Sequence, residues 1–439
     1  MYDLLIHNAA VITLDNEEMI DNGFVLVHEG RFIQVSEGPP PLALKEKAVN
    51  IKDAKGKWLL SGFFNTHCHT PMSILRGAAD DLPLDQWLKE EVWPREKFLD
   101  KDMIHAGTSL ALVEMIRSGT VGFLDMYHLH MDIVAEAVVE AGLKGALSRG
   151  MIALGFTPQE LKDKLNEAAV LAKGWESHES KRLKGFLFPH APYTCTPDFL
   201  EAVADRARSE NLPLSIHLAE TKKEVARHEK EYGKRPVEHL DDLGFFESPV
   251  LAAHGVHVNS FEIKLLTDKN VSVSHNPLSN LKLGSGVAPV GEMMKQGLHL
   301  SIGTDSVVSN NNLDMFQEVR TAALLQKGFF HDASLVTARE ALQMGTIHGA
   351  KAAGFTESGL IKEGYEADFI LVDSSKPHLQ PVENRVSHLV YSASGQDVTD
   401  VFVNGRAVMR NKELITLDEE KIVYEANNQY RRLNGLYRN

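Results

Sequence analysis

The sequence predicts an α/β fold, a (β/α)8 TIM barrel with a small composite β-sandwich domain built from the N- and C-terminal segments. Two observations lead to this prediction. Apolar, β-branched segments alternate with helical patterns through the middle of the chain, which is typical of parallel βα units. Shorter alternating patterns occur at both ends. We expect residues 1–58 and 357–439 to form the composite domain and residues 59–356 to form the barrel.

Eight strand candidates support the barrel, and each meets a polar residue able to do chemistry near its end. The first, Trp58–Asn65, leads into Thr66-His67-Cys68-His69. The carboxyl ends of barrel strands form one face, so such residues can meet there. The others are Thr120–Met126 with Asp125, Gly145–Gly150 with Arg149, Gly185–Pro189 before His190, Leu214–Ala219 with His217 and before Glu220, Val250–Ala253 before His254, Val271–Ser274 before His275, and His299–Thr304 before Asp305.

Helical patterns separate these candidates, and further strands lie outside them. The helical patterns include Ala106–Ser118, Met131–Ala141 and Pro197–Glu210. Because the outer strand patterns occupy both ends of the chain, the simplest arrangement is one β module beside the barrel. Turn signals such as Asn404-Gly405 divide its strands. These strand patterns are Asp3–Leu14, Gly23–Val35, Ala367–Asp373 and Asp400–Val408.

Composition narrows the class of protein. Hydrophobic residues make up 43% and charged residues 24% of the 439 residues, as in globular enzymes. A net charge of −14 disfavours a nucleic-acid partner. No apolar run is long enough to span a membrane and the N-terminus has no secretory pattern, so we expect no membrane partner and a cytoplasmic location. Homo-oligomers are common among soluble proteins, and nothing in the sequence excludes one.

Three histidines and one aspartate form a candidate metal site. His67 and His69 are two residues apart on a strand, so their imidazoles point to the same side. With His217 and Asp305 they make a ligand set that leaves a coordination position open, as in catalytic sites. Only two cysteines are present, so no thiolate cluster competes. We expect one divalent metal per chain, Zn²⁺ first and Fe²⁺ or Ni²⁺ as alternatives, which would make bound water a nucleophile.

The simpler interpretation is that each polar residue only caps a strand or hydrogen-bonds to backbone groups of a loop. This interpretation would have to apply independently to several residues. His128 and His130 repeat the His-x-His spacing, and we interpret them as non-catalytic loop residues. Glu220, three residues after His217, could donate a proton to a substrate, and His254 could orient the nucleophile or take its proton. A helix-capping glutamate and a buried hydrogen-bonded imidazole are the alternatives for these two residues.

The motifs resemble a known family over essentially the whole chain. His67-x-His69, His217, His254 and Asp305 resemble the ligand pattern of the amidohydrolase superfamily, and His217-Leu218-Ala219-Glu220 resembles its branch that deaminates aromatic bases. Within that branch the chain resembles the 5-methylthioadenosine/S-adenosylhomocysteine deaminases. The segments that carry this closer likeness are Asn65–His69, Arg76–Leu84, Pro189–Thr194, Tyr232–Pro236, His275–Gly286 and Ser309–Met315.

The resemblance implies a role for each matching residue. His67, His69, His217 and Asp305 would bind the metal, and a metal-bound hydroxide would attack C6 of the adenine ring of 5′-methylthioadenosine, S-adenosylhomocysteine or adenosine. The products would be the inosine analogue and ammonia. In the same way, Glu220 would protonate N1, His254 and Asp305 would manage the hydroxide and the leaving ammonia, His190 would contact the purine, Glu96 the ribose hydroxyls and Arg149 the 5′ substituent.

One departure leaves the 5′ group open. Some members of the family use a second arginine for the amino-acid tail, yet no arginine occurs between Gly150 and Lys181. The balance between thioether and amino-acid substrates therefore stays undecided at this point.

Three other functions stay open. The first is a barrel aminohydrolase for guanine, cytosine or a chlorotriazine. The second is a cyclic-amide hydrolase, which commonly bridges two metals with a carboxylated lysine after strand four, but Gly185–His190 contains no lysine. The third is a non-catalytic scaffold, which would be expected to lose metal ligands. A cytidine-deaminase type of site is disfavoured, because the chain has no Cys-x-x-Cys.

Overall fold

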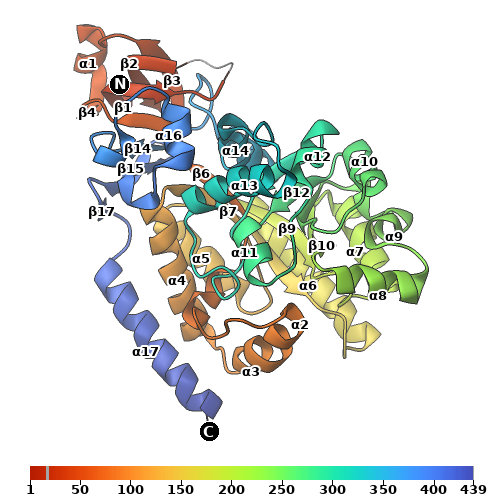
Figure 1. Cartoon of the computed structure of the whole chain (residues 1–439). Coiled ribbons are helices and arrows are strands. Elements are labelled where there is room, and N and C mark those ends of the chain that lie inside the picture. The colour runs from red at the N-terminus through yellow and green to blue at the C-terminus, as the bar shows by residue number, and fades with distance from the viewer. Residues whose placement is uncertain (16–18, 439) are drawn as a thin grey trace.

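The computed structural model describes residues 1–15 and 19–438, and its centre is a barrel of eight parallel strands (Figure 1). Neighbouring strands pair in chain order. A bridge between Cys68 and Asp305 joins the last strand region to the first. The predicted barrel is therefore confirmed. Its strands are β6 (Phe63–Cys68), β7 (Thr120–Tyr127), β8 (Lys144–Met151), β9 (Leu183–Pro189), β10 (Leu214–Leu218), β11 (Val250–His254), β12 (Ser272–His275) and β13 (His299–Ile302).

Helices surround the barrel and bury their apolar faces against its strands. Several begin with a capping box, as at Thr157, whose hydroxyl accepts from the backbone of Glu160. None of the described helices is long and apolar enough to cross a membrane. The helices are α4 (Lys101–Arg117), α5 (Met131–Ala141), α6 (Pro158–Glu176), α7 (Pro197–Glu210), α8 (Lys222–Tyr232), α9 (Pro236–Asp242), α10 (Ser260–Asp268), α11 (Pro277–Lys282), α12 (Val290–Lys295), α13 (Met315–Phe330), α14 (Ala338–Met344) and α15 (Ile347–Ala352), with the 3₁₀ turn η3 (Phe245–Glu247).

A second, mixed sheet combines strands from both ends of the chain, which confirms the predicted composite domain (Figure 1). Its order is β17-β16-β15-β14-β5-β1-β2-β3, with β4 beside β1. The strands are β1 (Tyr2–Ile12), β2 (Met19–His28), β3 (Arg31–Glu37), β4 (Ala48–Asp53), β5 (Trp58–Ser61), β14 (Phe369–Val372), β15 (Val398–Val403), β16 (Arg406–Arg410) and β17 (Glu413–Leu414). Short helical elements flank them, namely α1 (Leu42–Lys47), η4 (Pro377–Leu379), α16 (Arg385–Tyr391) and η5 (Gly395–Asp397), and the chain closes with α17 (Glu419–Arg438).

The first strand candidate divides between the two sheets. Trp58–Ser61 pairs with β1 and β14 of the terminal sheet, whereas Phe63–Cys68 begins the barrel. Gly62 lies at the crossing, where a Cβ atom would come within 2.2 Å of Val121 Cγ1. The sequence shows one apolar run because both halves are buried. The proposed domain limits, 1–58 with 357–439 and 59–356, stay a prediction.

A buried ion cluster joins the terminal sheet to the amino end of the barrel. Lys144, the first residue of β8, contacts the carboxylates of Asp368 and Glu366. Its Nζ also donates to Ser358 Oγ at 2.8 Å. Lys144 and Asp368 are fully buried, so the charges depend on one another for stabilisation. This junction occupies one end of the barrel and leaves the carboxyl end for the site.

A long excursion after β6 reaches the carboxyl end of the barrel. It consists of short, irregular helical turns rather than one helix. A π-helical stretch in its middle is of a kind often found at functional sites. The elements are η1 (Thr70–Leu75), α2 (Leu84–Gln86), η2 (Trp87–Val92) and α3 (Trp93–Glu96).

Asp400 on β15 forms ion pairs that join the C-terminal strands to the N-terminal segment of the terminal sheet. Its carboxylate lies 2.7 Å from Lys52 Nζ and 3.4 Å from Lys57 Nζ, and it accepts from Thr399 Oγ1 at 2.7 Å. Burial alone would raise the pKa of Asp400, but these donors and cations outweigh it and lower the pKa. A lowered pKa stabilises the fold above the unfolded-state pKa, and this stabilisation is lost as the pH falls through the folded-state value.

We therefore predict that Asp400→Asn lowers the free energy of unfolding at pH 7 by about 1–3 kcal/mol, the usual cost of leaving buried charged partners unmatched. The variant should also lose less stability than the parent as the pH falls from 6 into the acid range. Urea unfolding at several pH values measures both effects. Asp21→Asn is the control, because the Asp21 side chain is 81% exposed in its pair with Arg385 and such pairs contribute little. Equal unfolding curves for Asp400→Asn and the parent would contradict the role of Asp400.

Candidate active site

A cavity opens at the carboxyl ends of the barrel strands and gathers most of the predicted site residues. The short turns after β6 supply an apolar part of its wall, which includes Leu84, Leu88 and Val92. The strand ends supply the groups able to do chemistry. The predicted residues that line the cavity are Glu96, His69, His190, His217, Glu220, His254 and Asp305.

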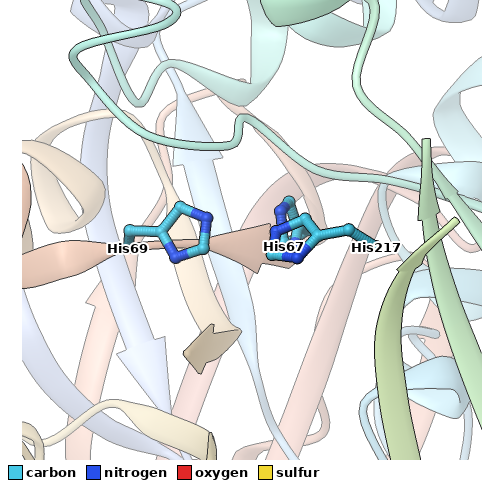
Figure 2. Close-up of side chains that lie close together, drawn as sticks. All are labelled: His67, His69 and His217. Atoms are coloured by element: carbon cyan, nitrogen blue, oxygen red, sulfur yellow. The ribbon is translucent and has the colours of Figure 1, made fainter. Parts of the chain in front are cut away.

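Three imidazoles lie close together (Figure 2), and two of them, His69 and His217, line the cavity. Ligand atoms of His67, His69 and His217 all lie within 4.8 Å of one another, and so do those of His67, His254 and Asp305. Asp305 Oδ1 is 3.1 Å from His69 Nε2 and 3.4 Å from His67 Nε2. These side chains lie in or directly after β6, in β10, at the end of β11 and after β13, so the barrel brings together residues that are far apart in the sequence.

Hydrogen bonds from the Nδ1 atoms fix the orientation of the His69 and His217 rings. His69 Nδ1 donates to the Met126 carbonyl at 2.7 Å, and His217 Nδ1 donates to the His190 carbonyl at 2.6 Å. Both rings therefore turn an Nε2 lone pair inward, as metal-binding histidines do. Neither ring nitrogen of buried His67 has a hydrogen-bond partner among the described residues. A buried imidazole without a partner is costly, and a metal ion would satisfy it.

The protonation states also suit a metal. Burial lowers the pKa of His67 to about 4 and places that of His217 well below its usual value, so both rings are neutral near pH 7 and can donate lone pairs. Burial alone would raise the pKa of Asp305, but His67 and His69 outweigh it and lower the pKa. His69 differs, because burial alone would lower its pKa but contact with the Asp305 carboxylate outweighs burial and raises the pKa. Two neutral imidazoles, a third that would release its proton on metal binding, and a carboxylate fit a divalent cation.

The two oxygens of Asp305 have different surroundings. Oδ1 faces the histidines, whereas Oδ2 accepts hydrogen bonds from Ser279 Oγ at 2.6 Å and from Ser309 Oγ at 3.0 Å. The serines hold the carboxylate in one orientation, which keeps Oδ1 directed at the imidazoles.

Three residues at the carboxyl ends of barrel strands have a left-handed backbone conformation. Ala219, His254 and Asp305 have φ angles of 51°, 76° and 62°, a region that residues other than glycine seldom occupy. Such backbone conformations persist where the surrounding structure enforces them, often at functional sites. Here they turn the chain sharply after β10, β11 and β13 and present the side chains to the cavity.

Glu220 and His254 face each other beside the cluster of His67, His69, His217 and Asp305. Glu220 Oε2 lies 3.9 Å from His254 Nε2, and Glu220 Oε1 accepts from Ser285 Oγ at 3.3 Å. Burial raises the pKa of Glu220, which favours the protonated acid. His254 Nδ1 lies 2.9 Å from Asn280 Oδ1 and 3.4 Å from Asn276 Nδ2, and these contacts leave Nε2 facing Glu220.

Glu224 holds the backbone that carries Glu220. Its carboxylate accepts from the backbone amides of Ala219 at 3.0 Å and Glu220 at 2.7 Å, and Thr221 caps the same helix, α8. Glu220 is therefore not the helix cap, because Thr221 is the N-cap of α8 and Glu224 completes its capping box.

Arg149 lies outside the residues that line the cavity. Its Nε is 3.1 Å from Glu167 Oε2 on α6, and a terminal nitrogen donates to the Gly150 carbonyl at 2.9 Å. Its role towards the 5′ group stays a prediction.

Two other residues at strand ends, Asp125 and His275, do not line the cavity. Asp125 accepts from the Thr70 backbone amide at 2.9 Å and from its hydroxyl, so it secures the turn that follows His69. His275 is buried, and its pKa is lowered by burial to about 3.

The sequence missed several residues around the cavity. Tyr127 and His128 line its wall. His128 and His130 both lie in the loop between β7 and α5, where the sequence places them, but of the two only His128 lines the cavity. Trp87 and Trp93 also line the wall. Tyr127 ends β7, so the strand-end pattern that identified the other residues could have found it.

Comparisons with known proteins agree with this geometry. A relative from Shouchella clausii named 5-methylthioadenosine/S-adenosylhomocysteine deaminase is 47% identical over 98% of this chain and 99% of its own. A 5′-deoxyadenosine deaminase from Methanosarcina mazei is 43% identical over 97% of each chain. The solved structure of an adenosine deaminase from Xanthomonas campestris with bound zinc is 33% identical, covers 99% of each chain and has a TM-score of 0.91. The sequence model of the Amidohydrolase family matches residues 58–408, and the chain therefore belongs to the amidohydrolase family.

Proposed function

We propose that this chain is a metal-dependent aminohydrolase that deaminates the adenine ring of 5′-methylthioadenosine and S-adenosylhomocysteine, with adenosine as a further substrate. Water replaces the 6-amino group, and the products are the inosine analogue and ammonia. The observation that carries the proposal is the convergence of three imidazoles, Asp305, Glu220 and His254 at one buried point. Relatives with deaminase names, similar over nearly the whole chain, support the choice of substrate.

The donor set supports one divalent ion per chain, held by His67, His69, His217 and Asp305. Zinc is the first choice, because nitrogen and oxygen donors with an open position suit it and the related adenosine deaminase structure contains zinc. Fe²⁺ and Ni²⁺ suit the same donors. When bound, the ion supplies Lewis acidity that makes water a stronger nucleophile near neutral pH.

Glu220 and His254 carry the protons. Glu220, whose pKa is raised by burial, donates a proton to N1 of the adenine and so makes C6 more electrophilic. His254 Nε2 and Asp305 take protons from the attacking water and pass them to the departing amine, which leaves as ammonia. One water is consumed and no oxidant or reductant is required.

The cavity wall supports a nucleoside with an apolar 5′ extension. His190 would contact the purine and Glu96 would accept hydrogen bonds from the ribose hydroxyls. Tryptophan and aliphatic side chains of the wall, among them Trp87 and Trp93, suit a thioether. Arg149 would have to leave Glu167 to pair with an amino-acid carboxylate, so we expect methylthioadenosine to be the better substrate. Action in the cytoplasm and assembly as a homo-oligomer stay predictions.

A substrate panel tests the proposal. The zinc-loaded protein is incubated with S-adenosylhomocysteine, methylthioadenosine, adenosine, guanine, cytosine and a chlorotriazine, and ammonia and the ultraviolet change from adenine to hypoxanthine are followed together. We expect turnover of the 5′-thio nucleosides, with lower or no turnover of the free bases. Turnover of free bases or triazines alone would assign the protein to another aminohydrolase, and no turnover at all would favour the scaffold.

Metal removal should abolish activity reversibly. Prolonged chelation should reduce turnover below about 1% and lower the melting temperature, because binding to the folded state stabilises it. Addition of one equivalent of Zn²⁺ should restore both. Elemental analysis measures the stoichiometry. A requirement for two equivalents, or full activity without metal, would contradict the single site.

Glu220→Gln should lower kcat roughly 10²–10⁴-fold, the usual contribution of a positioned general acid, while the melting temperature and metal content stay close to those of the parent. The glutamine keeps the size of the side chain but cannot deliver the proton. Glu201→Gln is the control, since Glu201 is exposed on α7. Near-normal turnover by Glu220→Gln would rule out the assigned proton donor.

A further inference from the structure

A buried tyrosine contacts the glutamate that we assign to the ribose. Tyr127 Oη donates to Glu96 Oε1 at 2.6 Å, and both side chains are buried and line the cavity. We infer that Tyr127 is a positioning residue that holds Glu96 ready for the 2′,3′-diol of a ribonucleoside and so contributes to selection against deoxyribose substrates. This inference rests on the proposed function and adds a residue that neither the sequence motifs nor the metal site required.

The two residues come from a short helix and from a strand inside the barrel. Glu96 ends α3, a four-residue helix in the irregular excursion after β6. Tyr127 ends β7, which pairs with barrel strands on both sides. On the outer side of the excursion, Arg95 lies over the ring of Tyr437, 4.3 Å from its centroid. The Tyr127 hydroxyl therefore ties the ribose-binding carboxylate to the barrel, and a site held by a rigid element spends less free energy on ordering when ligand binds.

The Glu96 carboxylate can accept more hydrogen bonds than the described residues donate to it. As a carboxylate it can only accept hydrogen bonds, and it has room for about four. Among the described residues, no cation pairs with Glu96, and the Tyr127 hydroxyl is the one side-chain donor that reaches it. A vicinal diol offers two further O–H donors on adjacent carbons, which matches the remaining need of a buried acceptor.

The tyrosine is itself held in place. The ring of His128 lies against the Tyr127 ring, with centroids 4.8 Å apart. Burial and the Glu96 carboxylate together raise the pKa of Tyr127 well above its usual value. The hydroxyl therefore stays a donor at physiological pH. Packing by His128 and the proton on Oη leave Glu96 with one preferred orientation.

The test compares a ribose ligand with its counterpart that lacks the diol. Calorimetry measures the binding of inosine and of 2′,3′-dideoxyinosine to the metal-loaded protein, and because these are product-like ligands no turnover is needed. For the parent we expect tighter binding of inosine. In Tyr127→Phe the ratio of the two dissociation constants should shrink roughly 10- to 150-fold, the contribution of one hydrogen bond to a charged group, with little change for dideoxyinosine. In kinetics, kcat/KM for adenosine should fall while that for dideoxyadenosine stays constant.

Two further variants separate positioning from a general loss of structure. Tyr232→Phe is the matched control, because Tyr232 Oη donates to Glu231 at 3.0 Å on the exposed side of α8, and it should leave the ratio unchanged. In the Glu96→Ala background, Tyr127→Phe should have no further effect on the ratio, since its target is gone. Melting temperatures show whether each variant is folded.

Several outcomes would overturn the inference. These are an unchanged ratio in Tyr127→Phe, equal weakening of both ligands, an undiminished effect of Tyr127→Phe without Glu96, or a parent protein that does not prefer inosine. Failure of the proposed function looks different. If no adenine nucleoside is deaminated and inosine is still preferred in a Tyr127-dependent way, the diol site is retained and only the reaction is wrong.

Discussion

Closure of the barrel between its first and last strands is the constraint on which the site depends. The Asp305 amide donates to the His67 carbonyl at 2.8 Å, and the side chain of Asn65 pairs with both the amide and the hydroxyl of Thr304. These bonds join positions about 240 residues apart in the chain and set Asp305 beside His67 and His69. Without closure the carboxylate and the imidazoles would have no fixed relation, and no metal ligand set would exist.

Around the contact between the first and last barrel strands, each reactive group has a neighbouring residue that holds it in place. Ser279 and Ser309 donate to one oxygen of Asp305, Asn280 contacts Nδ1 of His254, and Glu224 holds the strained turn before Glu220. The ligand rings owe their orientation to carbonyls of the adjacent strands. Such preorganisation lets a site act on charge as it develops without first rearranging. The ion cluster of Lys144 stabilises the opposite end of the barrel.

Much of this arrangement could be predicted from the sequence because barrel strands bring their ends to one face. Apolar runs that stop at His190, His217, His254 and Asp305 sufficed to indicate a convergent site, and the terminal strand patterns indicated a composite domain. The division of Trp58–Asn65 between two sheets could not be seen, because both halves are equally apolar. Tyr127, Asn280 and Ser279 were missed because their contacts depend on side-chain directions across separate strands and loops. The Arg149–Glu167 pair depends on helix placement in the same way.

The central claim is that one metal ion joins three imidazoles and Asp305. Anomalous scattering at the zinc edge, from crystals of the zinc-loaded protein, tests it most directly. We predict one peak per chain, at about 2.0–2.1 Å from the inward nitrogens of His67, His69 and His217 and about 2.0–2.2 Å from an oxygen of Asp305. No peak at this position, a second metal beside it, or a peak that lacks His217 or Asp305 as a ligand would contradict the account.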